Sequence, residues 1–165
     1  RRTWAPRGRT PVVRCWDRRD RLSVIGAITV PPSRRRHELN VVFRIHTRNT
    51  RTREATEFLR LLGRQVRGPL IVVLDRLSVH KAAVRAWLRD RRPEAPKVMV
   101  EWLPPYAPDL NPAEQLWNHG KRVDLANLAP ADREDLRGHV RRSLIRQRSR
   151  PNLLASAFDH AGLPL

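Results

Sequence analysis

The sequence predicts an α/β domain in which a β-hairpin is followed by alternating helices and strands. Its 165 residues are the length of one ordinary domain, and 40% of them are hydrophobic, which is enough to bury a core. Hydrophobic residues recur first at every second position and later at every third or fourth position, which indicates strands and then helices. This order of elements is typical of a layered α/β domain.

The hairpin is expected near the N-terminus. Residues 1–21 are rich in Arg and Pro, with a short strand expected at 12–16. Residues 22–30 and 39–46 each place hydrophobic side chains on one face, and a turn at 31–37 joins them. The side chains that define the two faces are Leu22, Val24, Ile28 and Val30 in the first arm and Leu39, Val41, Phe43 and Ile45 in the second.

An amphipathic helix and a buried strand come next. Helical spacing begins at Thr52, and Gly68 and Pro69 end the helix. Its apolar face holds Ala55, Phe58, Leu59, Leu62 and Val66. The uninterrupted apolar run at 70–74 is typical of a strand that is covered on both faces.

The remaining chain predicts further helices around one strand. A helix at 80–91 is followed by a strand at 98–103 and a rigid Pro-rich loop at 104–112. The apolar face of that helix holds Ala83, Val84, Trp87 and Leu88. Three more helices are expected: one from Asn111 to about Val123, a basic one at 131–148 with Leu136, Val140, Leu144 and Ile145, and a short one at 151–158.

The charge of the chain predicts a polyanionic partner. The net charge is +18, from 34 basic and 16 acidic residues, and only Lys81, Lys97 and Lys121 are lysines. A GC-rich genome would favour arginine over lysine, but it explains the net charge less well. The planar guanidinium suits phosphate, so we expect the protein to bind nucleic acid.

Several protein classes are disfavoured by composition. Cys15 is the sole cysteine, which excludes a disulfide within the chain and a cysteine zinc cluster and fits a cytoplasmic setting. No apolar run approaches the ~20 residues that span a bilayer, and no apolar segment follows the basic N-terminus as in a secretory signal. Met99 is the only methionine, so we expect a chain that opens at Arg1 to be a fragment of a longer reading frame.

Two acidic residues are candidates for a metal site. Asp75 follows the apolar strand at its carboxyl end, where open α/β sheets place ligands, although Asp also starts many turns. Glu114 comes after the next predicted strand, and carboxyl ends of adjacent parallel strands share an edge. Its alternative role is a capping box, with Asn111 as N-cap, Pro112 at N1 and Glu114 at N3.

Carboxylates of this kind serve two-metal phosphoryl transfer, because Mg²⁺ prefers oxygen ligands and a pair of ions activates the attacking oxygen and stabilises the leaving one. A third carboxylate is then needed from the sheet. Asp17 and Asp20 lie between arginines and have the character of solvated turn residues.

Other side chains near these acids have weaker signals. His80 starts the next predicted helix. It could assist a metal site or contact a phosphate, and the alternative is an ordinary surface histidine. Trp117 is at core spacing, and Lys121 is a candidate phosphate contact. We extend the candidate nucleic-acid contacts to Arg122, Arg141 and Arg142.

Two segments resemble a known family. Residues 103–122, LPPYAPDLNPAEQLWNHGKR, resemble the block around the third catalytic carboxylate of bacterial insertion-sequence transposases in the mariner-like superfamily, and Glu114 matches that acid. Residues 71–82, IVVLDRLSVHKA, resemble the second block, in which Asp75 and His80 match. Residues 1–11 and 150–163 are also similar to the family, so the likeness covers nearly the whole chain.

The resemblance implies an RNase H-like mixed sheet flanked by helices and a DDE/D site that holds two Mg²⁺ or Mn²⁺ ions. It implies a partial catalytic domain at 1–125 and a basic helical C-terminal extension at 126–165. The partners that it implies are transposon-end and target DNA, with a homodimer as a further expectation and a bacterial, nucleoid-associated location. Such enzymes cut DNA at the transposon ends and join the 3′-hydroxyl to a target.

The sequence also departs from the family. The first Asp and its central strand would precede Arg1, so we expect the chain as given to lack them and to be inactive. Arg76 replaces the usual Asn and would place a cation beside the metals, and Gly120 replaces an apolar residue at a cost of up to ~1 kcal/mol of helix stability relative to Ala. The alternatives are a non-catalytic DNA-binding remnant and another RNase H-like nuclease or integrase.

Overall fold

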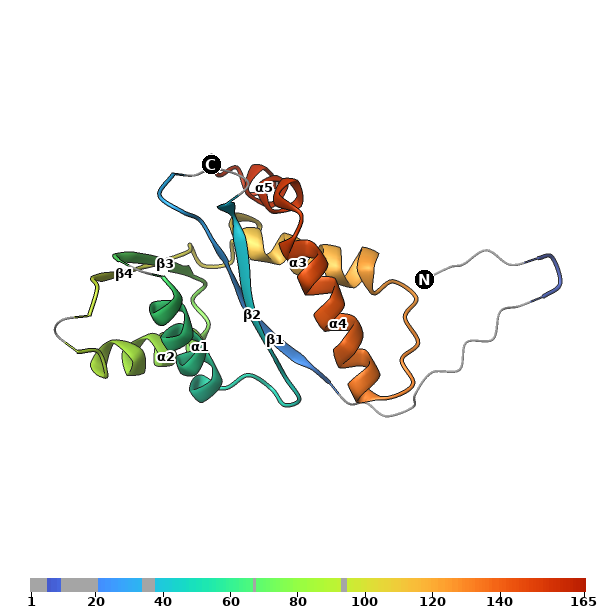
Figure 1. The fold of residues 1–165 in the computed structure, drawn as a ribbon, viewed down its shortest axis with the longest axis horizontal. Helices are drawn as coiled ribbons and strands as arrows, with labels where there is room; N and C mark the ends of the chain where they lie inside the picture. Colours follow the sequence, from blue (N-terminus) through green and yellow to red (C-terminus); the bar gives the residue numbers. More distant parts are fainter. Residues whose placement is uncertain (1–5, 10–20, 34–37, 67, 93–94) are drawn as a thin grey trace.

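The computed structural model describes residues 6–9, 21–33, 38–66, 68–92 and 95–165, and the strand expected at 12–16 lies outside them. The α/β class is confirmed (Figure 1). The strands and α-helices are β1 Ser23–Thr29, β2 Asn40–His46, α1 Thr52–Gln65, β3 Leu70–Leu74, α2 Ser78–Arg89, β4 Val98–Trp102, α3 Pro112–His119, α4 Arg133–Arg148 and α5 Pro151–His160. None of the described helices is long and apolar enough to cross a membrane.

The predicted hairpin is confirmed, and it lies in the middle of the molecule (Figure 1). β1 and β2 pair antiparallel with Ile28 opposite Val41, so the hydrophobic side chains assigned to one face do lie together. The other face is also used, because Ile25 and Val42 pack against the core of α1 and α2. The hairpin therefore joins two hydrophobic clusters.

β3 and β4 form a parallel pair whose inner face is covered by α1 and α2. Val72 is buried there against helix residues that include Phe58 and Trp87. The outer face is open, since Ile71 is 64% exposed and Val73 is 57% exposed. The prediction that residues 70–74 are covered on both faces is wrong, because among the described elements helices pack on only one side of this pair.

The four strands in the described part of the chain form two two-stranded sheets, one antiparallel and one parallel. Among the described residues, no further strand pairs with the other edge of β1 or of β3. Two small sheets flanked by helices are compatible with an RNase H-like fold.

The second cluster lies where α3 and α5 pack against β2, around Leu116 and Leu154. Trp117 lies over β1, where a Cβ added at Gly26 would be 2.8 Å from its ring. Trp117 is only half-buried and belongs to neither cluster, so it packs on β1 at the margin of the core, and the core role favoured for it stays a prediction. Leu88 and Ile145, which were assigned to apolar helix faces, are instead exposed at 41% and 38%.

α3 does not continue as a regular helix to Val123, because a π-helical turn spans Gly120–Asp124. Gly120 is buried, and a Cβ there would lie 3.0 Å from Nε2 of Gln147 on α4. Gly120 is thus more than a weak helix former, since it allows the close approach of α4 to this turn.

Asp124 closes the π turn in a buried polar network. Its side chain is 5% exposed, and its Oδ2 accepts hydrogen bonds from Ser143 Oγ at 2.6 Å and Gln147 Nε2 at 3.2 Å. Burial opposes ionisation, but these hydrogen bonds, with the charges of Arg146 and His119, hold the pKa of Asp124 below its ordinary value. The network joins the turn to α4.

Candidate catalytic site

Asp75 is held at the carboxyl end of β3 by two contacts to one of its oxygens. Its Oδ1 accepts a hydrogen bond from the backbone N of Leu77 at 3.1 Å and lies 2.5 Å from Nδ1 of His80. The structure thus brings together the two residues that the sequence singled out in this segment. Among the contacts of the described residues none involves Oδ2 of Asp75, so this oxygen is available to a cation while His80 orients the carboxylate.

The start of the loop after β4 is fixed beside Asp75. The backbone N of Leu103 donates to the carbonyl of Leu74 at 2.8 Å, and Nε of Arg76 donates to the carbonyl of Leu103 at 3.0 Å. Arg76 was expected to set a cation beside the metals. Its guanidinium donates to the loop beside Asp75, and the described ion pairs include none between Arg76 and Asp75. Whether Arg76 affects a metal ion there stays a prediction.

This loop presents one aromatic residue that the sequence analysis did not single out. Tyr106 is fully exposed, and its φ of 58° is in the left-handed region, which residues other than glycine seldom adopt. A 3₁₀ turn at Pro108–Leu110 then leads into α3. An aromatic residue between Pro105 and Pro108 was the available signal, because prolines restrict the loop conformations around it.

Glu114 is at the third position of α3, and the structure separates its two candidate roles. Asn111 caps the helix by accepting a hydrogen bond from the backbone N of Ala113 at 3.1 Å, as expected. The reciprocal bond of a capping box, in which the Glu114 carboxylate accepts from the backbone N of Asn111, is not among the described hydrogen bonds. In α1, by contrast, Glu54 makes this bond to the backbone N of Arg51 at 2.9 Å. The capping box predicted at Glu114 is therefore wrong, and capping does not account for its carboxylate.

Carboxylate oxygens are suitable ligands for Mg²⁺ or Mn²⁺, so Asp75 and Glu114 fit such an ion by their chemistry. In the described parts of the chain, however, no three His, Cys, Asp or Glu side chains are grouped so that they could hold a metal ion. Asp17 and Asp20 lie outside the described residues. That Asp75 and Glu114 share one metal site stays a prediction.

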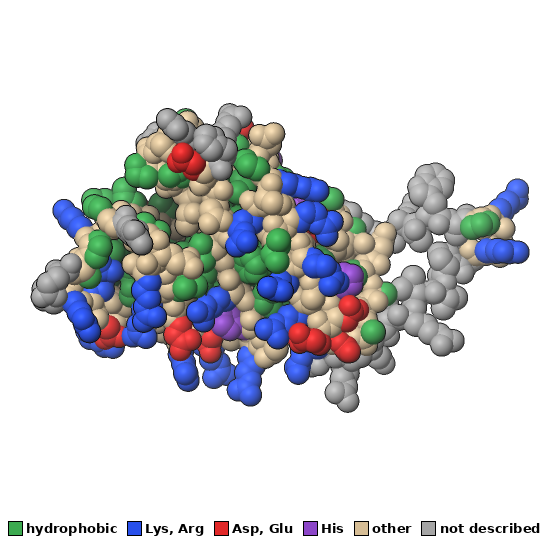
Figure 2. Space-filling model, in the orientation of Figure 1, with side chains coloured by type: hydrophobic (Ala, Val, Ile, Leu, Met, Phe, Trp, Pro, Cys, Tyr) green, Lys and Arg blue, Asp and Glu red, His purple; other side chains and the backbone are tan. Residues whose placement is uncertain are grey.

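The candidate DNA contacts are accessible. Lys121 and Arg122 are exposed in the π turn, and Arg141 and Arg142 are exposed on α4. On the face drawn in Figure 2, Lys and Arg side chains outnumber acidic ones and extend along its lower border. A polyanion would meet an excess of positive charge along this border, where acidic side chains lie between the basic ones.

A family model described as DDE superfamily endonuclease matches residues 1–137. The match includes β1 through α3 and therefore Asp75, His80 and Glu114. No curated protein and no solved structure matches the chain.

Proposed function

Because the chain belongs to the DDE superfamily endonuclease family, we propose that it is part of the catalytic domain of a mariner-like insertion-sequence transposase. The family acts on DNA and generally uses divalent metal ions. The finer assignment is that the intact enzyme cuts DNA at transposon ends and joins the freed 3′-hydroxyl to target DNA. It is supported by the resemblance of residues 71–82 and 103–122 to two catalytic blocks of those transposases.

The observation that carries the proposal is that two carboxylates keep oxygens outside the described protein contacts. Asp75 uses only Oδ1 in protein contacts, and the Glu114 side chain has no described hydrogen bond. In the proposed site these two acids bind Mg²⁺ or Mn²⁺, and His80 positions Asp75. When bound, the ions activate the attacking oxygen and stabilise the leaving one.

We expect both acids to be indispensable for cleavage. In the full-length protein, Asp75→Asn and Glu114→Gln should each abolish cleavage of labelled DNA in Mg²⁺ or Mn²⁺, because an amide is a poor replacement for an anionic metal ligand. DNA affinity, measured by fluorescence anisotropy, should not fall. His80→Ala should weaken metal affinity by about 10–100-fold, the usual effect of losing a residue that orients a ligand.

The matched control is Glu134→Gln, which removes an exposed carboxylate from α4 rather than from the sheet. This variant should cleave like the unmodified protein. Cleavage retained by Glu114→Gln would remove this residue from the site, and loss of DNA binding in the same variant would mean that folding, and not metal binding, was affected.

A non-catalytic DNA-binding remnant is the second candidate function. It is favoured by the lack of a three-ligand group among the described residues, together with the net charge of +18. On this basis we expect the 165-residue chain alone to bind DNA without cutting it.

The genomic sequence upstream of the Arg1 codon discriminates the two functions. An open reading frame that encodes a strand ending in Asp would support the enzyme. A stop codon or a frameshift there would support the remnant.

A further inference from the structure

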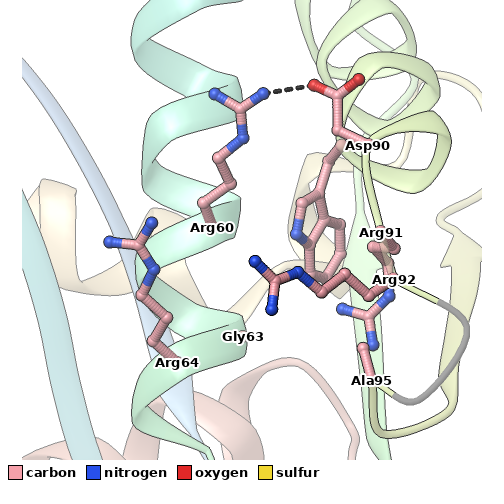
Figure 3. Close-up of a pocket in the computed structure, with 8 residues that line it drawn as sticks. Arg60, Gly63, Arg64, Asp90, Arg91, Arg92 and Ala95 are labelled. Atoms are coloured by element: carbon pink, nitrogen blue, oxygen red, sulfur yellow. Dashed lines mark hydrogen bonds and ion pairs between the residues drawn. The ribbon is translucent and has the colours of Figure 1, made fainter.

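A basic cavity lies at the far end of α2 from Asp75. α2 begins at Ser78, shortly after Asp75, and its 12 residues span roughly 18 Å at ~1.5 Å per residue. At its other end is an open cavity of about 660 Å³ between α1 and α2 (Figure 3). The cavity is lined by Arg60, Gly63 and Arg64 of α1 and by Trp87, Asp90, Arg91, Arg92 and Ala95.

The cavity carries an excess of positive charge. Of its four arginines, Arg60 is paired with Asp90, and Figure 3 shows this link across the cavity. For Arg64, Arg91 and Arg92, the described residues include no carboxylate partner. The C-terminal ends of two helices contribute about −0.5 charge each, which is less than the charge of three guanidinium groups that have no described carboxylate partner. The cavity therefore favours an anion.

Part of the lining is held in place before any ligand binds. The guanidinium carbon of Arg91 lies 5.2 Å from the centre of the Trp87 ring, and Arg91 also donates to the carbonyl of Pro96. A Cβ at Gly63 would lie 3.1 Å from the Trp87 ring, so glycine permits α1 to pack closely there. An arginine fixed in this way loses less conformational freedom on binding an anion.

We propose that this cavity binds phosphate groups of the DNA backbone. It is a DNA contact separate from the candidate catalytic site at Asp75. The inference rests on the proposed function, which supplies the DNA. Arginine forks suit phosphate oxygens. Trp87 is only 3% exposed and is covered by Arg91, so it offers no face on which a base could stack.

The test compares two double variants that remove the same charge. Arg64→Gln with Arg92→Gln removes two arginines without a described carboxylate partner from the cavity, and Arg44→Gln with Arg48→Gln removes two exposed arginines outside both the cavity and α4. Duplex affinity is measured by anisotropy over a salt series. The slope of log affinity against log salt should fall by about 1.8 in the cavity variant, at ~0.9 per lost phosphate contact, and by clearly less in the control. Equal changes in the two variants would overturn the proposal.

A second measurement reads individual arginines in the unmodified chain. Phenylglyoxal modification with mass spectrometry should show Arg64 and Arg92 protected by DNA, and Arg44 and Arg48 still reactive. Absence of protection at Arg64 and Arg92 would also overturn the proposal. Neither result depends on metal or cleavage, so failure of the cavity is distinguishable from failure of the catalytic proposal at Asp75 and Glu114.

Discussion

At the scale of single residues, three carboxylates show how surroundings determine what an acid does. Asp124 is buried, and its hydrogen bonds from α4 make it structural. Asp75 is 38% exposed and engages only one oxygen, through His80 and a backbone N–H. Glu114 has no described side-chain hydrogen bond, although it occupies a capping position. The two acids with unused oxygens are those placed in the candidate site.

We predict that Asp124 contributes a pH-dependent part of the stability. Because its pKa is lower in the folded chain, its charged form stabilises the fold at pH values above the ordinary pKa of 3.8. This contribution is lost as the pH falls through the lower folded pKa. Urea unfolding of Asp124→Asn should show lower stability than the unmodified chain at pH 7 and a smaller difference near pH 3. A constant difference at both pH values would contradict the prediction.

At the scale of elements, β3 shows that strand composition and strand burial are separate properties. All five residues of β3 are hydrophobic, yet Val72 faces α1 and α2 while its neighbours Ile71 and Val73 face outward. Alternation in burial follows from the strand geometry, in which successive side chains point to opposite faces. The number of covered faces depends on which other elements pack there.

Two identical substitutions in β3 should have different effects. Val72→Ala removes buried methyl groups and should lower the free energy of unfolding by about 2 kcal/mol. Val73→Ala changes a side chain that is 57% exposed and should cost less than about 1 kcal/mol. Denaturant unfolding of both variants gives the comparison. Equal costs would mean that the outer face of β3 is covered in solution.

At the scale of the whole molecule, the main property is the net charge of +18, carried almost entirely by arginine. The charge is not confined to one element: exposed arginines lie on α4, at the π turn and around the cavity between α1 and α2. Long-range attraction to DNA therefore does not require the metal site.

We predict DNA binding that depends steeply on salt and weakly on sequence. If the chain neutralises 6–10 phosphates, affinity should fall by about 10³–10⁵-fold between 50 and 200 mM salt, because counterions are released on binding. Anisotropy with two unrelated duplexes should give similar curves. Binding that is insensitive to salt, or a large preference for one duplex, would contradict this prediction.

The sequence by itself determined the order of the elements and the candidate acids. The periods of two and of three to four residues predicted β1, β2 and α1, because these patterns record which side of a local element is buried. Asp75 and Glu114 stood out because each follows a strand of a parallel pair and matches a family motif, and β3 and β4 are indeed parallel.

Only the tertiary structure decided how distant segments meet. It showed that Arg76 bonds to Leu103, that Gly120 admits α4, that Glu114 does not close its cap, and that the outer face of β3 is open. It also assembled the arginine cavity from the ends of α1 and α2. Such contacts join residues far apart in the chain, whereas periodicity and motifs describe only neighbours, so packing settles what local patterns leave open.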